Sequence, residues 1–302
     1  MGTTENQRSK TRKWNSAELA ERYRCQYAID VRRFLPDDEV TLRRDEASGV
    51  WMFRGGIPGD GPFYEQLHTS SEYYLEEKWE FGQAFRWLGE SSPHARILEI
   101  GCGNGAFLDL CRRAGFERLR GLELNARARR ECREKGHAVS DQLIEQLGPS
   151  DGSFDYICAF QVLEHVPDPV GFLRAAAGRL RRGGKLILST PNAASFLARY
   201  KWCLLDLPPH HMSRWDELSF RKTADLLGLS VVAICNEPLA KYHYRFFANS
   251  LVEHLPPKSL RRRAAKPIAR AGFAAYPWKR SIAGHSMLAV LSKDAVISKD
   301  AV

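Results

Sequence analysis

The sequence predicts an α/β fold in which helices cover both faces of a mainly parallel β-sheet. From Pro93 onward, short apolar runs alternate with segments whose apolar residues recur at helical spacing, which is typical of strand–helix–strand units. The first of these runs ends in a glycine-rich loop that opens a helix, as binding loops of such sheets do. Hydrophobic residues make up 44% and charged residues 27% of the 302 residues, which excludes disorder over most of the chain.

Each element is predicted from its apolar pattern. Short apolar runs predict strands at 95–100, 119–124, 155–160, 185–189, 229–235 and 287–291. Apolar residues at helical spacing predict helices at 71–88, 106–114, 126–135 and 215–227. Asp168-Pro169 is a strong helix start, and Gly183-Gly184 is expected to end that helix.

The chain is expected to have three parts. Residues 1–16 are polar and mostly lack a packing face, which predicts a disordered tail. Residues 17–92 form an N-terminal extension that ends in the helix before the first strand of the sheet. Residues 93–302 form the α/β domain. We expect its two insertions, at about 193–216 and 240–282, to lie over the end of the sheet where α/β proteins bind ligands.

Charge and composition exclude several classes of protein. The net charge is +9, but residues 258–280 hold eight basic residues and no acid, so the charge is a local patch and not a nucleic-acid-binding surface. No apolar run approaches the ~18 residues of a membrane-spanning helix, and no apolar segment of a signal peptide follows Met1, so we expect a cytoplasmic protein. Seven cysteines without CxxC spacing predict reduced thiols rather than a disulfide framework or a zinc ribbon.

The segment most informative about chemistry is the loop after the first strand. Gly101, Gly103 and Gly105 form a GxGxG pattern, which allows a tight turn and a close approach of the backbone to a ligand. Glu99 precedes this loop, and Glu123 ends the next strand, where a carboxylate can accept hydrogen bonds from both ribose hydroxyls. A diphosphate would be repelled by Glu99, whereas the ammonium and sulfonium groups of S-adenosylmethionine would be attracted.

The sequence resembles the class I S-adenosylmethionine-dependent methyltransferases. The resemblance is carried by blocks that occur in order, LEIGCGNGAF (98–107), GLELN (121–125), FDYICAFQVLEHVPDP (154–169), LRRGGKLILSTPN (180–192) and GHSMLAVLSK (284–293). It is strongest to the ubiquinone-biosynthesis O-methyltransferase type and related small-molecule enzymes. It implies S-adenosylmethionine as cofactor and a Rossmann-like, seven-stranded, mostly parallel sheet whose last strand is antiparallel.

The resemblance also implies a cofactor site. The methionine part should lie among Glu99, Gly101, Cys102, Gly103 and Gly105, and the ribose beside Glu123 and Leu124. Asp141 or Gln142 should lie beside the adenine, and Phe160 and Gln161 should form the floor, although core packing is an equal interpretation of Phe160. The helix before the first strand should cover the cofactor and bring Tyr73, Tyr74 and Trp79 near it, with core packing favoured for Trp79.

Histidines are the candidates for proton removal from an acceptor, because imidazole titrates near neutral pH. We favour His211 and His165 over His210 as the base. Some methyltransferase relatives hold a divalent ion with an ExxEH pattern and a further histidine. Here Gln161 replaces the first acid of that pattern, before Glu164 and His165, so we expect no metal.

The predicted function is methyl transfer from S-adenosylmethionine to a small-molecule acceptor, with oxygen favoured over nitrogen or carbon as the methylated atom. The alternatives are a lipid- or carrier-linked acceptor such as a quinone or a glycan, and a non-catalytic relic that only binds the cofactor. The intact glycine loop argues against the relic, and the lack of an NPPY-type block argues against a nucleic-acid substrate. Residues 258–280 are interpreted either as a lid over the acceptor or as a peripheral contact with an anionic membrane.

Overall fold

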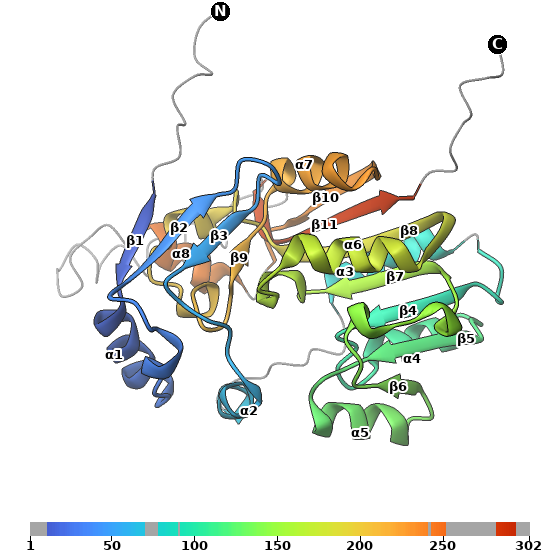
Figure 1. Ribbon diagram of the computed structural model, residues 1–302, viewed down its shortest axis with the longest axis horizontal. Coiled ribbons are helices and arrows are strands. Elements are labelled where there is room, and N and C mark those ends of the chain that lie inside the picture. Colours follow the sequence, from blue (N-terminus) through green and yellow to red (C-terminus); the bar gives the residue numbers. More distant parts are fainter. Residues whose placement is uncertain (1–10, 70–77, 90, 241–242, 252–281, 294–302) are drawn as a thin grey trace, which may run out of the picture.

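A seven-stranded sheet forms the centre of the computed structural model, which describes residues 11–69, 78–89, 91–240, 243–251 and 282–293 (Figure 1). The strand order is β10-β11-β8-β7-β4-β5-β6. The strands are β4 (Arg96–Ile100), β5 (Arg118–Leu122), β6 (Ala138–Ser140), β7 (Phe154–Phe160), β8 (Leu180–Pro191), β10 (Ser230–Pro238) and β11 (Ala283–Ser292). β11 pairs antiparallel with both β10 and β8, and the other neighbouring strands of this sheet pair in parallel. The predicted Rossmann-like sheet with an antiparallel last strand is therefore confirmed.

Helices cover both faces of this sheet, because its strands are apolar on both sides. Ile187 of β8 packs with α3 (Trp79–Leu88) and α4 (Ala106–Arg113). Its neighbours Leu186 and Leu188 point the other way, into the core that α6 (Pro169–Arg179) and α7 (Glu217–Leu227) share. The remaining helix of this part, α5 (Ala126–Glu134), packs beside β6. The expected helix at 71–88 is confirmed for residues 79–88.

One boundary prediction is wrong. The helix that Asp168 caps ends at Arg179 and not at Gly183-Gly184, and β8 begins at once with Leu180. Leu180 is buried and pairs with Phe154, and a β-bulge then separates this pair from the next one. Glycine suits such an irregular stretch because it accepts a left-handed backbone, as Gly183 does here with φ +73°. The two glycines therefore lie inside the strand.

A second sheet, which the sequence did not predict, lies beside the first (Figure 1, left). It is antiparallel, with the order β1 (Arg12–Asn15), β2 (Glu39–Arg44), β3 (Trp51–Arg54) and β9 (Ser213–Arg214). Three helices accompany it, α1 (Ser16–Tyr27), α2 (Gly61–Thr69) and α8 (Tyr244–Leu251). Since β9 belongs to the insertion at 193–216, the extension and that insertion build one structure.

The predicted disordered tail is wrong for residues 12–16. Trp14 of β1 is fully buried, and its indole Nε1 donates a hydrogen bond to the carbonyl oxygen of Lys201 at 2.9 Å. Its ring packs against Phe53 at 5.7 Å between centroids. A single large aromatic side chain in a polar stretch thus anchors the strand. Residues 1–10 lie outside the described residues.

Short 3-10 helices connect the larger elements. They are η1 (Arg32–Phe34), η2 (Ile144–Gln146), η3 (Pro149–Asp151), η4 (Leu163–His165), η5 (Phe196–Arg199) and η6 (Leu204–Asp206). Tyr73, Tyr74 and the basic stretch 258–280 lie outside the described residues, so the lid and membrane interpretations both stay predictions. Within the described part, no helix combines the length and the apolar character that crossing a bilayer requires.

Candidate active site

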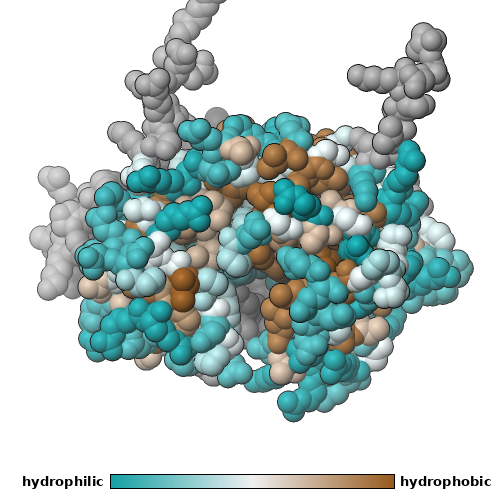
Figure 2. All heavy atoms as spheres, viewed as in Figure 1, coloured by the Kyte–Doolittle hydropathy of each residue, from teal (hydrophilic) through white to brown (hydrophobic). Residues whose placement is uncertain are grey.

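A cavity of about 930 Å³ opens where the parallel strands of the main sheet end. Its walls include Gly101 after β4, Glu123 after β5 and Phe160 at the end of β7. The opposite wall comes from α2, with Tyr64, and from the loop before β9, with His211. Figure 2 shows the surface hollowed between these two halves of the molecule. The site therefore lies between the end of the main sheet and two elements next to the second sheet, namely α2 and the loop before β9.

The glycine-rich loop has a backbone conformation that would be strained in residues other than glycine. Gly101, Gly103 and Gly105 have φ values of +70°, +54° and +83°. The amides of Gly101 and Cys102 both donate to the carbonyl oxygen of Leu122, at 2.7 and 3.1 Å, which fastens the loop to β5. A Cβ atom on Gly101 would lie 2.5 Å from Cγ2 of Val162. The cavity wall at this point is thus bare backbone for steric reasons.

Glu123 connects this loop to the start of the next helix. Its Oε2 accepts a hydrogen bond from the amide of Gly103 at 2.8 Å, and its Oε1 accepts one from the amide of Asn125 at 2.7 Å. Each carboxylate oxygen has a further lone pair. The side chain lines the cavity and can accept hydrogen bonds from two hydroxyls of a ligand.

Glu99 is buried, and its Oε2 has no hydrogen-bond partner among the described residues. Burial raises the pKa of its carboxyl group well above the usual range, although the positive charge of Lys78 opposes this shift. Lys78 lines the cavity, whereas Glu99 is not part of its wall. Contact between Glu99 and a cofactor therefore stays a prediction.

The other predicted cofactor residues divide into two groups. Leu124 and Gln142 line the cavity, and Gln142 is held by a hydrogen bond from Nη2 of Arg120 at 2.9 Å. Cys102 is buried in a small core with Leu108 and Cys132 and is not part of the cavity wall. Asp141 is absent from the cavity wall, and its exposed carboxylate forms an ion pair with the mostly buried Arg129 at 3.2 Å. Of the alternatives for the adenine, the structure therefore brings Gln142 to the cavity.

Phe160 and Gln161 form the floor between the cavity and the core. Phe160 packs edge-on against Phe107 and Phe81 and also lines the cavity, so both interpretations of this residue hold. Gln161 has φ +57°, which is unusual for a residue other than glycine. Its Nε2 donates to the buried Glu80 at 2.9 Å, which fixes the amide at the floor.

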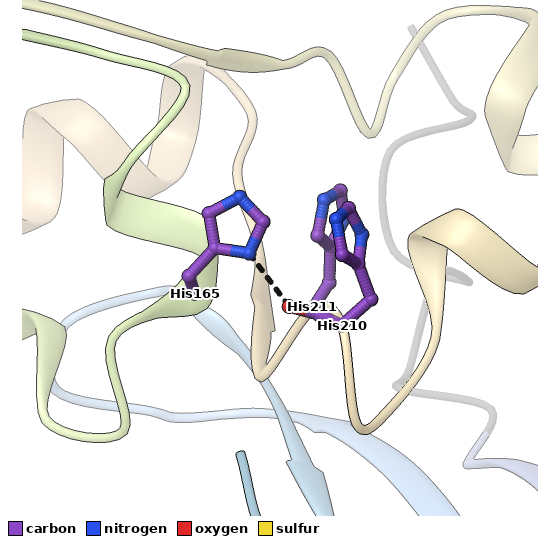
Figure 3. A group of neighbouring side chains, drawn as sticks. All are labelled: His165, His210 and His211. Atoms are coloured by element: carbon purple, nitrogen blue, oxygen red, sulfur yellow. Dashed lines mark hydrogen bonds between the residues drawn. The ribbon is translucent and has the colours of Figure 1, made fainter. Parts of the chain in front are cut away.

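Three histidines meet at the other end of the cavity (Figure 3). His165 ends η4, and its ring faces the stacked rings of His210 and His211, which follow η6. The Nδ1 atom of His165 lies 2.7 Å from the carbonyl oxygen of His210. Both histidines that the sequence favours as bases are thus in the cavity wall, and His210 is with them.

Burial dominates the protonation of these side chains. It lowers the pKa of His165 to about 4, although hydrogen bonds to the carbonyl groups of His210 and Gln161 oppose the shift, and it lowers that of His211 well below the usual range. It raises the pKa of the neighbouring Glu164 to about 8. Around neutral pH the imidazoles of His165 and His211 are therefore uncharged and able to accept a proton.

Several cavity residues were not predicted as site residues. The hydroxyl oxygen of Tyr64 lies 3.3 Å from Nδ1 of His165, and His285 of β11 also lines the cavity. Lys78, the residue just before α3, also lines the cavity, and behind the wall the buried Glu80 accepts a hydrogen bond from Gln161. Tyr64 and His285 occur in the GDGPFYEQL and GHSM segments, but only the folded chain shows which side of their elements faces the cavity.

The residues at the sheet end fit S-adenosylmethionine. A loop that a Cβ would obstruct and the carboxylate of Glu123 in the cavity wall suit a nucleoside ligand that carries hydroxyl groups. Fold and site together define the class as the S-adenosylmethionine-dependent methyltransferases. The chain belongs to the family described as "Methyltransferase domain", whose model matches residues 72–234, more than half of the chain.

Curated proteins similar to this chain include ubiquinone biosynthesis O-methyltransferases. The one from Ralstonia nicotianae is 32% identical over 163 residues, which cover 49% of this chain and 66% of the relative. The one from Xanthomonas campestris pv. campestris is 35% identical over 171 residues, with 48% and 68% covered. The chain thus matches about two thirds of the length of these relatives.

Solved structures share the fold. A SAM-dependent methyltransferase from Archaeoglobus fulgidus has a TM-score of 0.52 at 18% identity, covering 76% of this chain and all of that chain. Magnesium protoporphyrin IX methyltransferase from Synechocystis, solved with bound SAH, has a TM-score of 0.51 at 16% identity, covering 77% of this chain and 94% of that chain. At such identities the likeness concerns the fold alone.

Proposed function

We propose that this chain transfers a methyl group from S-adenosylmethionine to a hydroxyl oxygen of a small-molecule acceptor. The observation that carries this proposal is one continuous cavity with two chemically different ends. One end has the glycine loop and the carboxylate of Glu123, and the other has three imidazoles. The names of the similar curated proteins, which are O-methyltransferases, support oxygen as the methylated atom.

The cofactor supplies a methyl group made electrophilic by its sulfonium. The protein's part is to hold the acceptor in line with that group, because positioning supplies most of the rate of such a displacement. Uncharged His165 and His211 are in the protonation state of a general base for the hydroxyl proton. Their lowered pKa values also make them weak bases, so proton removal needs help from a second group or from an acidic acceptor.

An aromatic hydroxyl compound is the acceptor class that the site supports best. Tyr64, Phe160 and the imidazole rings offer flat surfaces on which an aromatic ring can pack. The word ubiquinone in the names of the relatives agrees with an acceptor of this kind. A lipid-linked acceptor is the alternative, and it shares the same reacting group.

Methyl transfer from S-adenosylmethionine with a labelled methyl group tests the proposal. The purified chain is incubated with water-soluble metabolites and, separately, with a lipid extract, and the labelled product is identified. We expect an O-methylated compound. A labelled product from the water-soluble metabolites indicates a free acceptor, and one from the lipid extract indicates a lipid-linked acceptor. Label found only on nitrogen or carbon, or no label at all, would contradict O-methylation.

The cofactor end is tested by Glu123→Ala. Losing hydrogen bonds to a charged group costs about 1.5–3 kcal/mol, so we expect the affinity for S-adenosylmethionine to fall by about one to two powers of ten in calorimetry. Asp141→Asn is the matched control, because this nearby carboxylate is exposed and outside the cavity. Equal affinity of the Glu123 variant and the wild type would remove Glu123 from the cofactor site.

The acceptor end is tested by His165→Ala and His211→Ala. Loss of the true base should lower turnover by about 10²–10⁴-fold, while the affinity for S-adenosylmethionine stays near that of the wild type. Full turnover of both variants between acidic and basic pH would show that positioning alone drives the reaction.

A further inference from the structure

Gln142 follows β6 by two residues and lines the cavity, one strand beyond Glu123. Arg120 of β5 donates a hydrogen bond through Nη2 to Oε1 of Gln142 at 2.9 Å, and the hydroxyl group of Ser140 donates to the same oxygen at 3.2 Å. Because a guanidinium group only donates hydrogen bonds, the amide atom that faces it must be the oxygen. The orientation of the Gln142 amide is therefore determined by its surroundings.

These contacts leave only hydrogen-bond donors for a ligand. An amide oxygen has two lone pairs, and Arg120 and Ser140 occupy both of them. The Nε2 atom of Gln142 makes no hydrogen bond within the described part of the chain. Gln142 can therefore offer two N–H groups to a ligand in the cavity, but no acceptor.

Arg120 is itself held in place. Its Nη1 donates to Oδ1 of Asp151 at 2.7 Å, and the side chains of this ion pair are only 25% and 19% exposed. The other carboxylate oxygen of Asp151 accepts a hydrogen bond from the amide of Gly148 at 2.8 Å. The guanidinium group cannot turn away from Gln142 without also weakening its ion pair with Asp151.

The neighbouring acid does not supply an acceptor to the cavity. Asp141 is not part of the cavity wall, and its carboxylate, which is 65% exposed, forms an ion pair with Arg129 at 3.2 Å. Arg129 is fixed in turn, because its Nη1 donates to the carbonyl oxygens of Glu123 and Leu124 at 2.9 and 3.0 Å. Of the two polar residues after β6, the wall thus contains the one that donates.

Two exposed apolar side chains indicate where a flat base packs. Leu124 and Leu143 line the cavity with Gln142, and they are 63% and 47% exposed. A planar base would remove this apolar surface from water. Neighbouring strands lie about 4.8 Å apart, so a base whose ribose is at Glu123 after β5 extends toward the residues after β6. The edge of adenine that is far from the ribose, which carries N1, then meets Gln142.

We propose that Gln142 donates a hydrogen bond to N1 of adenine and that Arg120 is the positioning residue that keeps the amide in this orientation. This inference rests on the proposed function for the identity of the cofactor. Adenine has a lone pair on N1, whereas hypoxanthine, its deaminated counterpart, has a proton there. A wall that offers only donors at this point binds adenine and rejects hypoxanthine, because two donors would face each other. The site therefore excludes the deaminated form of the cofactor.

The test compares three forms of S-adenosylhomocysteine, the demethylated cofactor, by calorimetry on the full chain. They are the natural compound, its 1-deaza analogue, which has carbon in place of N1, and its inosine analogue. We expect each analogue to bind about ten-fold or more weakly than the natural compound, since a donor is left without a partner. Equal affinity for the natural compound and the 1-deaza analogue would overturn the proposal, and so would the absence of any binding.

Gln142→Glu replaces the donor by an acceptor and keeps a partner for Arg120. It should weaken binding of S-adenosylhomocysteine and strengthen binding of the inosine analogue, so the ratio of the two dissociation constants should shift by about 100-fold. Asp141→Asn is the matched control at the adjacent position and should leave this ratio unchanged. A ratio that shifts in Asp141→Asn but not in Gln142→Glu would show that Asp141 contacts the base.

Arg120→Met tests the positioning role. Without the guanidinium group the amide of Gln142 can rotate and offer its oxygen, so discrimination between the two bases should fall, while the affinity for S-adenosylhomocysteine falls less than in Gln142→Glu. A change in fold alone would weaken both ligands equally, and thermal unfolding verifies that each variant is folded. Unchanged discrimination in folded Arg120→Met would refute the role of Arg120. If this variant does not fold, Gln142→Glu still decides, because it keeps the ion pair of Arg120 with Asp151.

Base recognition and methyl transfer fail separately. The affinities need no acceptor, so the expected ratios in a chain that methylates no hydroxyl compound would support base recognition and contradict the proposed function. Equal binding of the adenine and inosine forms by a chain that methylates its acceptor would contradict base recognition and leave the proposed function in place.

Discussion

Asp206→Asn removes the negative charge from a buried ion pair between Asp206, at the end of η6, and Arg214 of β9. Asp206 and Arg214 are each about 5% exposed, and Oδ2 of the former lies 2.9 Å from Nη2 of the latter. Arg214 also lies over the rings of Trp14 and Phe53, so its guanidinium cannot turn toward water without losing these contacts. Breaking a buried pair by removing one charge costs about 3–5 kcal/mol, because the other charge stays buried.

The carbonyl oxygen of Asp206 still accepts hydrogen bonds from Arg214, at 3.0 and 3.3 Å, so we expect the lower end of this range, about 3 kcal/mol. The measurement is urea unfolding followed by far-UV circular dichroism. Glu217→Gln is the control, because it breaks an exposed pair with Arg221 whose loss costs only about 0.5 kcal/mol or less. Adding Arg214→Met to Asp206→Asn should restore part of the stability.

A loss below about 1 kcal/mol in Asp206→Asn would refute this reasoning, since the remaining charge would then be compensated in some other way. A double variant less stable than Asp206→Asn alone would refute it as well. In that case the contacts of the Arg214 side chain with Trp14 and Phe53, and not its charge, would stabilise this region.

Three further predictions concern stability and the glycine loop. Burial raises the pKa of Glu99 above its ordinary value of 4.5, so the folded state holds this proton more tightly than the unfolded state does. The wild type should therefore lose stability relative to Glu99→Gln as the pH rises from 4.5 through the folded-state pKa. Parallel pH profiles of the two proteins in urea unfolding would contradict this. Gly101→Ala adds about 1–2 kcal/mol of backbone strain and a contact of 2.5 Å with Val162, so both thermal stability and calorimetric affinity for S-adenosylmethionine should fall, and unchanged values would show that the loop can move aside. Trp14→Ala should cost about 3–5 kcal/mol in urea unfolding, and a cost near zero would mean that β1 contributes little.

The main sheet could be predicted because its signals are local. The strand before Gly101 and the helix after Asp168 each have an apolar pattern and, within a few positions of it, the residues that end or begin the element. The same holds for Glu123, whose place one residue beyond β5 follows from the length of that strand. The resemblance to methyltransferases rests on these same blocks, so it extends the prediction to the cofactor half of the cavity.

In the acceptor half the sequence predicted His165 and His211, but not how this half is built, because its structure depends on contacts between distant segments. β9 has only two residues, and it pairs with β3 about 160 positions earlier in the chain. His165 and His210 meet through a backbone carbonyl 45 residues away, a relation that no spacing rule contains. Glu164 stood in the sequence only as a member of a metal-binding pattern, and its lack of hydrogen-bond partners among the described residues became visible only after folding.

The pairing of β3 with β9 sets an order on folding during synthesis. Trp51 leaves the ribosome long before its partner Arg214, and at about 5–20 residues per second this interval lasts roughly 8–30 seconds. During that time the edge of β3 that later pairs with β9 is available to other chains, which makes nascent β3 a place for aggregation or chaperone binding. The acceptor half of the cavity therefore forms late, after the strands up to β8 that carry the cofactor half have been made.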